Sequence, residues 1–368
     1  MDNLRIIIAG GGTGGHLFPA IAIGEEIKER YPKAEIHFIG SNFGLEAKVF
    51  PVKDLLHTLL PIRGLQRGLS LDSVLKNLIL PLRILRSLLK VRALFKEYKP
   101  NLVIGTGGYA SALPLFMATL QKKSIPIVLQ EQNSFPGITT RWFSKKANLI
   151  CTAFKTDNLD VKNKLVITGN PIRRNIISGD RKFALKVYDL DIEKNTLFVF
   201  GGSQGSAVLN KSLESIINKF DNKSIQILWQ TGDNEYNKYK KYKNDTIKIV
   251  PFINDMAAAY ALCDLVICRS GALTLSEVTT CGKPSILIPF AAAAGNHQMK
   301  NAKTLYQAGA SILIEERELK SDKLFKNINY LINNKNILEK MSAAAKDLGN
   351  PNATKKIANH IIDIVSNV

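Results

Sequence analysis

The sequence predicts an α/β protein with two Rossmann-like domains built on parallel sheets. A short apolar strand, Leu4 to Ala9, runs into a glycine loop, Gly10 to Gly15, and then into a helix from about Pro19 to Arg30. The same order returns in the second half, where a strand from Leu197 to Phe200 precedes the loop from Gly201 to Gly205. The length of 368 residues gives each half room for its own core. We therefore expect two doubly wound domains that face each other across a cleft.

The first glycine loop has the spacing of a phosphate-binding loop. Gly10, Gly12 and Gly15 fit G-x-G-x-x-G, which lets a backbone approach a phosphate closely. A dinucleotide-binding domain also carries an acidic residue at the end of its second strand. Here the second strand, Glu35 to Ile39, ends in Gly40, Ser41 and Asn42. The missing carboxylate argues against NAD as the ligand.

The stretch from Asp264 to Gln298 is the most informative part of the second half. A strand from Leu265 to Cys268 turns through Ser270 and Gly271 into a predicted helix. The start of a helix leaves free N–H groups and the positive end of the helix dipole, which suit a diphosphate. Glu277, further into this helix, could accept hydrogen bonds from a ribose diol. An ordinary strand and capped helix would explain the same spacing equally well.

The remaining strands and helices of the chain follow the same α/β alternation. Polar residues cluster after the strands Leu102–Ile104 and Ile127–Leu129, where open α/β sheets bind their ligands. Asp322 to Lys346 is predicted as helical, and Pro351 introduces a last amphipathic helix. Further strands are predicted at four places: Ile225–Trp229, Ile247–Val250, Ser285–Ile288 and Leu165–Thr168.

The chain is basic, and part of the charge is concentrated in one segment. It has 50 Lys and Arg against 31 Asp and Glu, a net charge of +19. Such an excess favours an anionic partner such as a nucleic acid, a membrane surface or a phosphorylated substrate. In the segment 75–86, apolar and basic residues lie side by side at helical spacing, as they do on helices that bind anionic bilayers. A helix packed on the core with a solvated basic face remains the alternative. The candidate membrane residues are Leu75, Lys76, Leu78, Ile79, Leu82, Arg83 and Arg86.

No metal site or cofactor is predicted. The four cysteines lack C-x-x-C spacing and histidine partners, so we expect buried thiols in a reducing compartment. No Asp-x-Asp pair follows a strand, as it does in sugar transferases that hold a nucleotide diphosphate through a metal.

Seven motifs follow one another along nearly the whole chain: Gly11–His16, Gly107–Tyr109, Glu131–Asn133, Gly169–Arg173, Gly201–Gly205, Phe252–Met256 and Arg269–Glu277. Taken together and in this order, they resemble the MurG family of peptidoglycan glycosyltransferases. The resemblance implies a two-domain GT-B fold. Residues 1–165 with a C-terminal helix, 352–368, would bind the acceptor and the membrane, and residues 166–350 would bind the donor. We expect that helix to pack back on the N-terminal domain.

The resemblance also implies the reaction and its partners. N-acetylglucosamine would pass with inversion from UDP-N-acetylglucosamine (UDP-GlcNAc) to the C4 hydroxyl of the muramyl sugar of lipid I, giving lipid II without a cofactor. The work would take place at the cytoplasmic face of the bacterial membrane, on an anionic lipid surface and without nucleic acid. Lipid I is undecaprenyl-pyrophosphoryl-MurNAc-peptide.

The family's contacts carry over to matching positions of this sequence. Arg173 and Ser203 would approach the diphosphate, the Ile253 backbone the uracil, and Gln298 the sugar hydroxyls. The loop before Gln298, Ala291 to Gly295, departs from the family because it offers no polar side chains. The segment Ala272, Leu273, Thr274, Leu275, Ser276 and Glu277 would hold the diphosphate and ribose. The first domain would contribute Thr13, Gly14, Gly15 and Asn133 near the donor sugar, and Gly12, Gly107, Gly108 and Tyr109 toward the acceptor.

Two residues are candidates for the general base. His16 fits because deprotonating a sugar hydroxyl requires a group that titrates near neutrality. A histidine at a helix start beside a glycine loop could equally contact only a phosphate. Glu131 is the other candidate, either as the base or as a residue that orients His16.

Two other functions stay open at this point. A UDP-GlcNAc 2-epimerase of the same fold would rearrange the donor and need no lipid acceptor. A basic membrane-binding protein without enzymatic activity would explain the charge, but not the paired glycine loops or Glu277.

Overall fold

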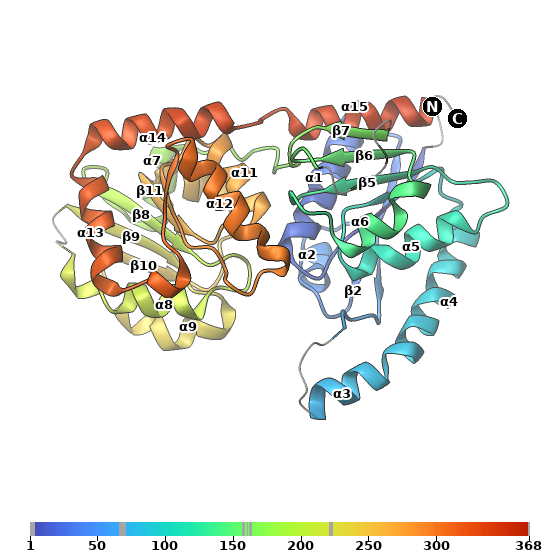
Figure 1. Ribbon diagram of the computed structural model, residues 1–368, viewed down its shortest axis with the longest axis horizontal. Coiled ribbons are helices and arrows are strands. Elements are labelled where there is room, and N and C mark those ends of the chain that lie inside the picture. The colour runs from blue at the N-terminus through green and yellow to red at the C-terminus, as the bar shows by residue number, and fades with distance from the viewer. Residues whose placement is uncertain are drawn as a thin grey trace. The chain divides into compact units, whose positions relative to one another are not determined.

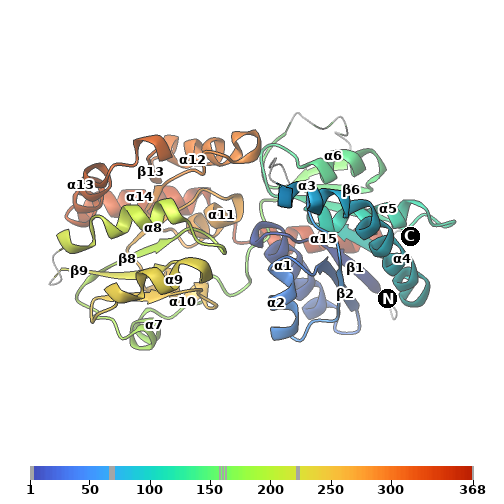
Figure 2. The same ribbon diagram turned by 90° about the horizontal axis from the view of Figure 1, so that it is seen from below.

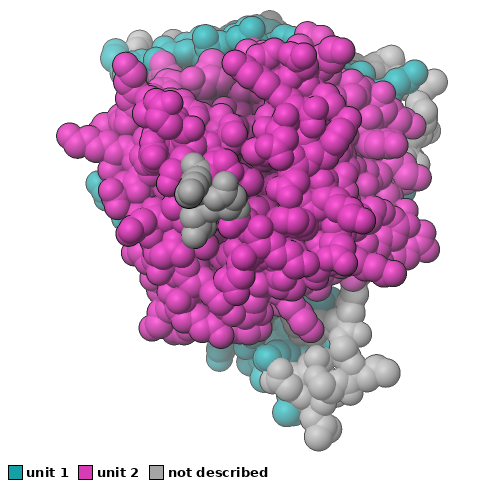
Figure 3. All heavy atoms as spheres, turned by 90° about the vertical axis from the view of Figure 1, so that its left-hand side faces the viewer, with its two compact units in different colours: residues 1–172, 352–368 teal, residues 173–351 magenta. Residues whose placement is uncertain are grey.

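The computed structural model describes residues 4–366 apart from 66–70, 157–158, 160, 162–163 and 221–223. The chain divides into two compact units, which Figure 3 shows in different colours. Unit 1 holds residues 1–172 and 352–368, and unit 2 holds residues 173–351. Each unit is a parallel sheet with helices, so the prediction of two parallel-sheet domains is confirmed.

Unit 1 contains a seven-stranded parallel sheet in the order β3-β2-β1-β4-β5-β6-β7. Alternate residues of β1 point to opposite faces, as in any strand. Ile6 and Ile8 therefore join one apolar core, and Ile7 and Ala9 join another. The strands are β1 Arg5–Ala9, β2 Glu35–Ser41, β3 His57–Leu60, β4 Leu102–Gly105, β5 Ile127–Glu131, β6 Leu149–Thr152 and β7 Leu165–Ile167.

Helices cover both faces of this sheet (Figure 1). The C-terminal helix α15 packs beside α1 and buries Ile357, Ala358 and Ile361 in the same core, as predicted for the end of the chain. On the other face, α4, α5 and α6 supply Val91, Leu115 and Phe143. The helices of the unit are α1 Gly14–Arg30, α2 Glu46–Val52, α3 Leu71–Leu78, α4 Leu80–Tyr98, α5 Tyr109–Thr119, α6 Ile138–Phe143 and α15 Ala353–Ser366.

Unit 2 contains a six-stranded parallel sheet in the order β10-β9-β8-β11-β12-β13. Its strands are β8 Asn195–Phe200, β9 Ile225–Gln230, β10 Ile247–Val250, β11 Leu265–Cys268, β12 Ser285–Leu287 and β13 Ser311–Leu313. Its helices are α7 Arg181–Tyr188, α8 Ala207–Glu214, α9 Asp233–Tyr239, α10 Met256–Leu262, α11 Ala272–Thr280, α12 His297–Gln307, α13 Ser321–Ile332 and α14 Lys335–Leu348.

In both sheets the strand order reverses next to a glycine loop. β1 lies beside β4 in unit 1, with Ala9 opposite Gly105, and β8 lies beside β11 in unit 2, with Phe200 opposite Cys268. The loops that follow these strands therefore begin side by side. Open α/β sheets bind their ligands in the crevice at such a reversal.

One sequence prediction of a helix limit was wrong. The first helix begins at Gly14 rather than near Pro19, because Thr13 is extended and the chain turns into the helix directly after the loop. The stretch 322–346, predicted as helical, is helical apart from Asn333 and Asn334, which separate α13 from α14. Asparagine favours helix ends because its side chain competes for backbone hydrogen bonds.

Helix α3 and the first turns of α4 extend away from the sheet of unit 1 (Figure 1), and the later part of α4 packs on the sheet through Val91 and Phe95. Figure 2 shows the same helices from below. Pro81 lies in the first turn of α4, where a missing N–H costs nothing, and so divides α3 from α4 instead of breaking a helix. Among the described residues, no helix is long and apolar enough to cross a membrane.

Candidate active site

The loop after β1 turns at Gly12 and opens directly into α1. Gly12 has φ +92°, a conformation that other residues rarely adopt, and this allows the sharp turn. Thr13 O accepts from the N–H groups of His16 and Leu17, at 3.2 and 3.1 Å. Within the described part of the chain, the N–H groups of Gly14 and Gly15 have no acceptor. They are free to bind an anion or a sugar oxygen at the helix start.

A buried carboxylate accepts hydrogen bonds from the backbone of the loop after β1. Glu46 at the start of α2 is fully buried, and its two carboxylate oxygens accept from Gly12 N at 3.0 and 3.1 Å. Ser41 N donates to Glu46 Oε1 at 2.8 Å. A Cβ added at Gly11 would lie 2.2 Å from Glu46 Oε1, so glycine is required there. Glu46 thus ties the loop after β1 to the end of β2.

The glycine loop after β4, which contains Gly107 and Gly108, packs against the loop after β1 through His16. A Cβ added at Gly107 would lie 2.7 Å from His16 Nδ1, and one added at Gly108 would lie 2.2 Å from Gly11 O. Tyr109 closes the arrangement, because its ring would meet a Cβ at Gly12 at 2.8 Å. The structure therefore brings the predicted acceptor residues Gly12, Gly107, Gly108 and Tyr109 together around His16.

The hydrogen bonds of His16 define its tautomer. Nδ1 lies 3.0 Å from both Thr106 O and Gln132 Oε1, and both atoms are acceptors. The orientation of the Gln132 amide follows from its other end, since Nε2 donates to Thr106 O at 2.7 Å and also to Gln130 Oε1. Nδ1 therefore carries the proton, and Nε2 keeps the lone pair that a general base needs.

Glu131 is held by its own loop. It is buried, with Oε1 accepting from Asn133 N at 3.0 Å and Oε2 accepting from Gly137 N at 2.9 Å and Thr140 Oγ1 at 2.6 Å. Its partners are therefore the residues that follow β5, whereas the side chain that contacts His16 is Gln132. Asn133 Nδ2 also donates to Glu131, at 3.3 Å.

In the loop after β8 of unit 2, one glycine has open space at its Cβ position. Gly202 has φ +90° and nothing within 4 Å of the Cβ position, whereas Gly205 lies against Thr231 O. Ser203 follows Gly202 in this loop. Gln230, at the end of β9, donates to Gly202 O at 3.0 Å and accepts from Ile253 N at 2.8 Å. Because that N–H is already used, the backbone group that Ile253 can offer a base is its carbonyl oxygen.

The start of α11 provides free amides beside a buried carboxylate. The N–H groups of Ala272, Leu273 and Thr274 have no acceptor among the described residues. Ala272, Leu273 and Leu275 are buried, so only their backbone groups can serve a ligand, while Ser276 Oγ donates to Ala272 O at 2.9 Å.

Glu277 is the most unusual group of this unit. It is 4% exposed, and its Oε2 accepts from Tyr260 Oη at 3.3 Å. Its Oε1 has no hydrogen-bond partner in the described structure, although Arg173 Nε lies 3.6 Å away. Burial raises the pKa of this carboxyl, and Arg173 and Tyr260 act in the opposite direction. A buried oxygen without a donor is suited to a ligand hydroxyl.

Gln298 lies in the first turn of α12, beside the start of α11. Its carbonyl accepts from Ser270 Oγ at 2.8 Å, and its side-chain Oε1 accepts from Phe290 N at 3.0 Å. Nothing in the described part of the chain accepts from the side-chain amide nitrogen of Gln298, which leaves it for a ligand. The loop of small residues before it is held from outside by Glu316, which accepts from Ala291 N at 3.0 Å and pairs with Arg269 at 3.1 Å.

Sequence reasoning missed several residues that shape these sites. Glu46, Gln132, Gln230 and Tyr260 each act through contacts between distant segments. The signal available for Gln132 was its position after a strand, beside Glu131. In the described part of the chain, no group of three His, Cys, Asp or Glu side chains could hold a metal ion.

Two domain families of known proteins match this chain and define its class. The glycosyltransferase family 28 N-terminal domain matches residues 6–152, and the family 28 C-terminal domain matches residues 196–361. The chain is therefore a glycosyltransferase with both domains of that family. Within it, the chain belongs to the family of UDP-N-acetylglucosamine–N-acetylmuramyl-(pentapeptide) pyrophosphoryl-undecaprenol N-acetylglucosamine transferases. The recognition of the MurG family from the seven motifs is confirmed.

The similarity extends over the whole chain. The relative from Christiangramia forsetii is 39% identical and covers 100% of this chain and 99% of its own length. The one from Flavobacterium psychrophilum is 40% identical, with 99% of each chain covered. The crystal structure of Acinetobacter baumannii MurG matches with a TM-score of 0.71 and 25% identity over 99% of this chain and 100% of that one.

A likeness to epimerases concerns the fold alone. UDP-GlcNAc 2-epimerase from Neisseria meningitidis, bound to UDP-GlcNAc, matches with a TM-score of 0.66 but only 13% identity, over 99% of this chain and 100% of that one. The epimerase alternative therefore has less support than the transferase.

Proposed function

We propose that this protein transfers N-acetylglucosamine from UDP-GlcNAc to the C4 hydroxyl of the muramyl sugar of lipid I, with inversion, and so makes lipid II for peptidoglycan. The observation that carries the proposal lies in unit 2, where three amides at the start of α11 have no acceptor among the described residues and Glu277 keeps a buried oxygen without a hydrogen-bond donor. The amides suit a diphosphate and the carboxylate suits a ribose. The full-length relatives are named for this reaction.

In this reaction unit 1 takes the acceptor. The acceptor oxygen attacks the anomeric carbon, the bond from that carbon to the UDP oxygen breaks, and the acceptor proton passes to His16 Nε2. Thr106 O and Gln132 Oε1, each 3.0 Å from Nδ1, accept the Nδ1 proton in hydrogen bonds and stabilise the imidazolium that forms. UDP leaves with its negative charge facing the amides of α11, Arg173 and Ser203.

A transfer assay tests the proposal. Purified protein is incubated with labelled UDP-GlcNAc and a short-chain lipid I analogue, and the products are separated and identified by mass. We expect a disaccharide on the lipid-linked acceptor and free UDP. Formation of UDP-N-acetylmannosamine without acceptor would instead identify an epimerase and refute the transferase.

Transfer should continue in EDTA. The helix start of α11 and Arg173 can neutralise the leaving diphosphate without a divalent cation. The measurement is the initial rate in EDTA compared with the rate in magnesium or manganese. A rate that collapses on chelation and returns with either ion would contradict the proposal that protein groups handle this charge.

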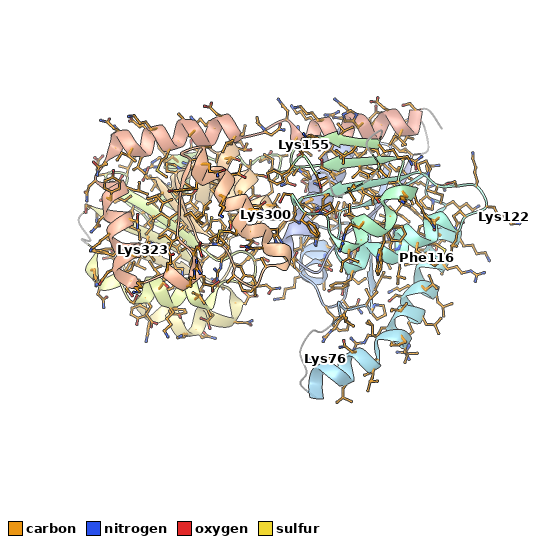
Figure 4. The ribbon with its side chains drawn as sticks, viewed as in Figure 1. Lys76, Phe116, Lys122, Lys155, Lys300 and Lys323 are labelled. Carbon is orange, nitrogen blue, oxygen red and sulfur yellow. The ribbon has the colours of Figure 1, made fainter. Side chains whose placement is uncertain are left out.

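We also propose that α3 and α4 bind unit 1 to the cytoplasmic face of the bacterial membrane. Leu75, Leu78 and Leu82 are 59%, 70% and 48% exposed, and Arg86 on α4 is exposed too. Figure 4 shows Lys76 on α3. An exposed apolar surface of this kind rimmed by cations suits an anionic bilayer.

The membrane proposal predicts loss of vesicle binding in a triple variant. Changing Leu78, Lys76 and Arg86 to Ser should release the protein from phosphatidylglycerol vesicles, because each basic residue near such a surface contributes about 1 kcal/mol and Leu78 adds apolar burial. Turnover of a soluble acceptor should stay unchanged. Co-sedimentation measures the binding, and equal sedimentation of variant and parent would favour a solvated helix face instead.

A further inference from the structure

Two arginines of unit 1 stack on one aromatic ring. The guanidinium carbons of Arg63 and Arg83 lie 3.8 and 4.9 Å from the centroid of the Phe43 ring. Phe43 follows β2 and is 42% exposed, and its N–H donates to Ser41 Oγ at 3.1 Å. Stacking on a ring fixes the plane of a guanidinium and leaves its N–H groups to point outward from the edge.

Both guanidiniums have donors that nothing described in the chain satisfies. Arg63 Nε and Arg83 Nη1 are buried atoms without a hydrogen-bond partner, and within the described residues neither arginine forms an ion pair. Donors shielded from water and left without an acceptor raise the energy of the unliganded protein. An anion that binds both arginines would remove that cost.

The pair adjoins the loops that surround His16. Arg63 is followed by Gly64, whose Cβ position lies 3.1 Å from Tyr109 Cδ1, and the Tyr109 ring also covers Gly12. Burial raises the pKa of the Tyr109 phenol, whereas Ser41 and Arg63 act to lower it, so the charge of Arg63 reaches this ring. Arg83 differs from the exposed Arg86 on the same helix in being half-buried.

We propose that Arg63 and Arg83 form a subsite for a lipid-borne phosphate group, and we assign it to the diphosphate of the acceptor. The proposal rests on the function proposed above and specifies which side chains bind the acceptor's charge. Guanidinium groups bind phosphate oxygens through paired N–H donors, which suits two arginines that each keep an unsatisfied N–H group. A diphosphate offers oxygens to both at once.

The test measures steady-state kinetics with a short-chain, water-soluble lipid I analogue and no vesicles. Arg63→Met and Arg83→Met keep an unbranched side chain over the Phe43 ring but remove the charge. Each should raise the acceptor KM by about ten- to a hundredfold, the range expected for a lost charge-assisted hydrogen bond, and leave the donor KM unchanged. Since both arginines would hold one group, the double variant should lose less than the product of the single effects.

The control and a direct binding measurement separate the possible failures. Arg92→Met, at an exposed position on α4, removes the same charge and should leave the acceptor KM at the parent value. Calorimetric binding of inorganic pyrophosphate should weaken in the Arg63 and Arg83 variants, and this readout needs no activity. If the parent transfers no sugar yet pyrophosphate binding still depends on both arginines, the proposed function fails and the subsite stands.

Two results would overturn the subsite. The first is an acceptor KM that rises no more in Arg63→Met and Arg83→Met than in Arg92→Met. The second is an unchanged acceptor KM together with lost binding to phosphatidylglycerol vesicles, which would assign the arginines to phospholipid headgroups instead of the acceptor. Circular dichroism of each variant shows that the fold is retained.

Discussion

Replacement of His16 by Ala is expected to lower turnover by roughly 100- to 10,000-fold, the usual contribution of general acid–base catalysis. The proton on Nδ1 is held by Thr106 O and Gln132 Oε1, so Nε2 is the nitrogen that can accept the acceptor's proton. The KM for UDP-GlcNAc should change little, because the lost interaction belongs to the transition state. Steady-state kinetics with saturating acceptor measures both quantities.

The pH dependence of the rate provides a second measurement. A reaction that depends on a general base slows toward acidic pH, and His16→Ala should lose this limb of the pH–rate profile if His16 is that base. His57→Ala is the matched control, since His57 lies in β3, where its Nδ1 hydrogen-bonds Leu55 O at 2.7 Å and its ring packs on Phe50, and neither contact involves His16. A fall of less than tenfold with raised KM values would make His16 a binding residue, and Glu131 would become the base to test.

Much of the fold could be predicted because its signals are local. Apolar runs followed by glycine loops identified β1, β4, β8 and β11, which are the strands that carry the sites. Short strands without such a loop, β3, β6 and β13, were not predicted. Each has only three or four residues, and so brief an apolar run is ambiguous without its neighbours.

The hydrogen bonds that hold the loops of the candidate site in place could not be predicted in the same way. Gly12 and Glu46 are 34 positions apart, and His16 and Gln132 are 116 positions apart, so no spacing rule connects them. Their contacts exist because parallel strands end at the same edge of the sheet, where residues from separate loops meet. A sequence pattern can mark each loop, but which side chain reaches which loop depends on the packing between them.

Glu277→Gln is expected to raise the KM for UDP-GlcNAc by tenfold or more and to leave the acceptor KM unchanged. Glu277 Oε1 is buried without a hydrogen-bond donor, and a ribose hydroxyl would provide one. A hydrogen bond to a charged group is worth about 1.5–3 kcal/mol, and about 1.4 kcal/mol corresponds to a factor of ten. Glutamine keeps the size of the side chain and an oxygen for Tyr260 Oη, so the packing of α11 should survive. Donor-dependent initial rates measure the effect.

Stability separates a binding role of Glu277 from a structural one. Because burial raises the pKa of this carboxyl, the folded protein holds its proton more tightly than the unfolded chain does. The stabilising contribution is thus complete below the ordinary glutamate pKa and is lost as the pH rises through the raised value. Above the raised pKa the ionised carboxylate costs stability, and Glu277→Gln, which cannot ionise, should melt no lower than the parent there. A structural carboxylate predicts the reverse, with a lower melting temperature and an unchanged donor KM.

Glu214→Gln is the matched control, because Glu214 also accepts from a tyrosine, Tyr242 Oη at 2.9 Å, but lies in α8. A donor KM that rises equally in both variants would remove Glu277 from the ribose site.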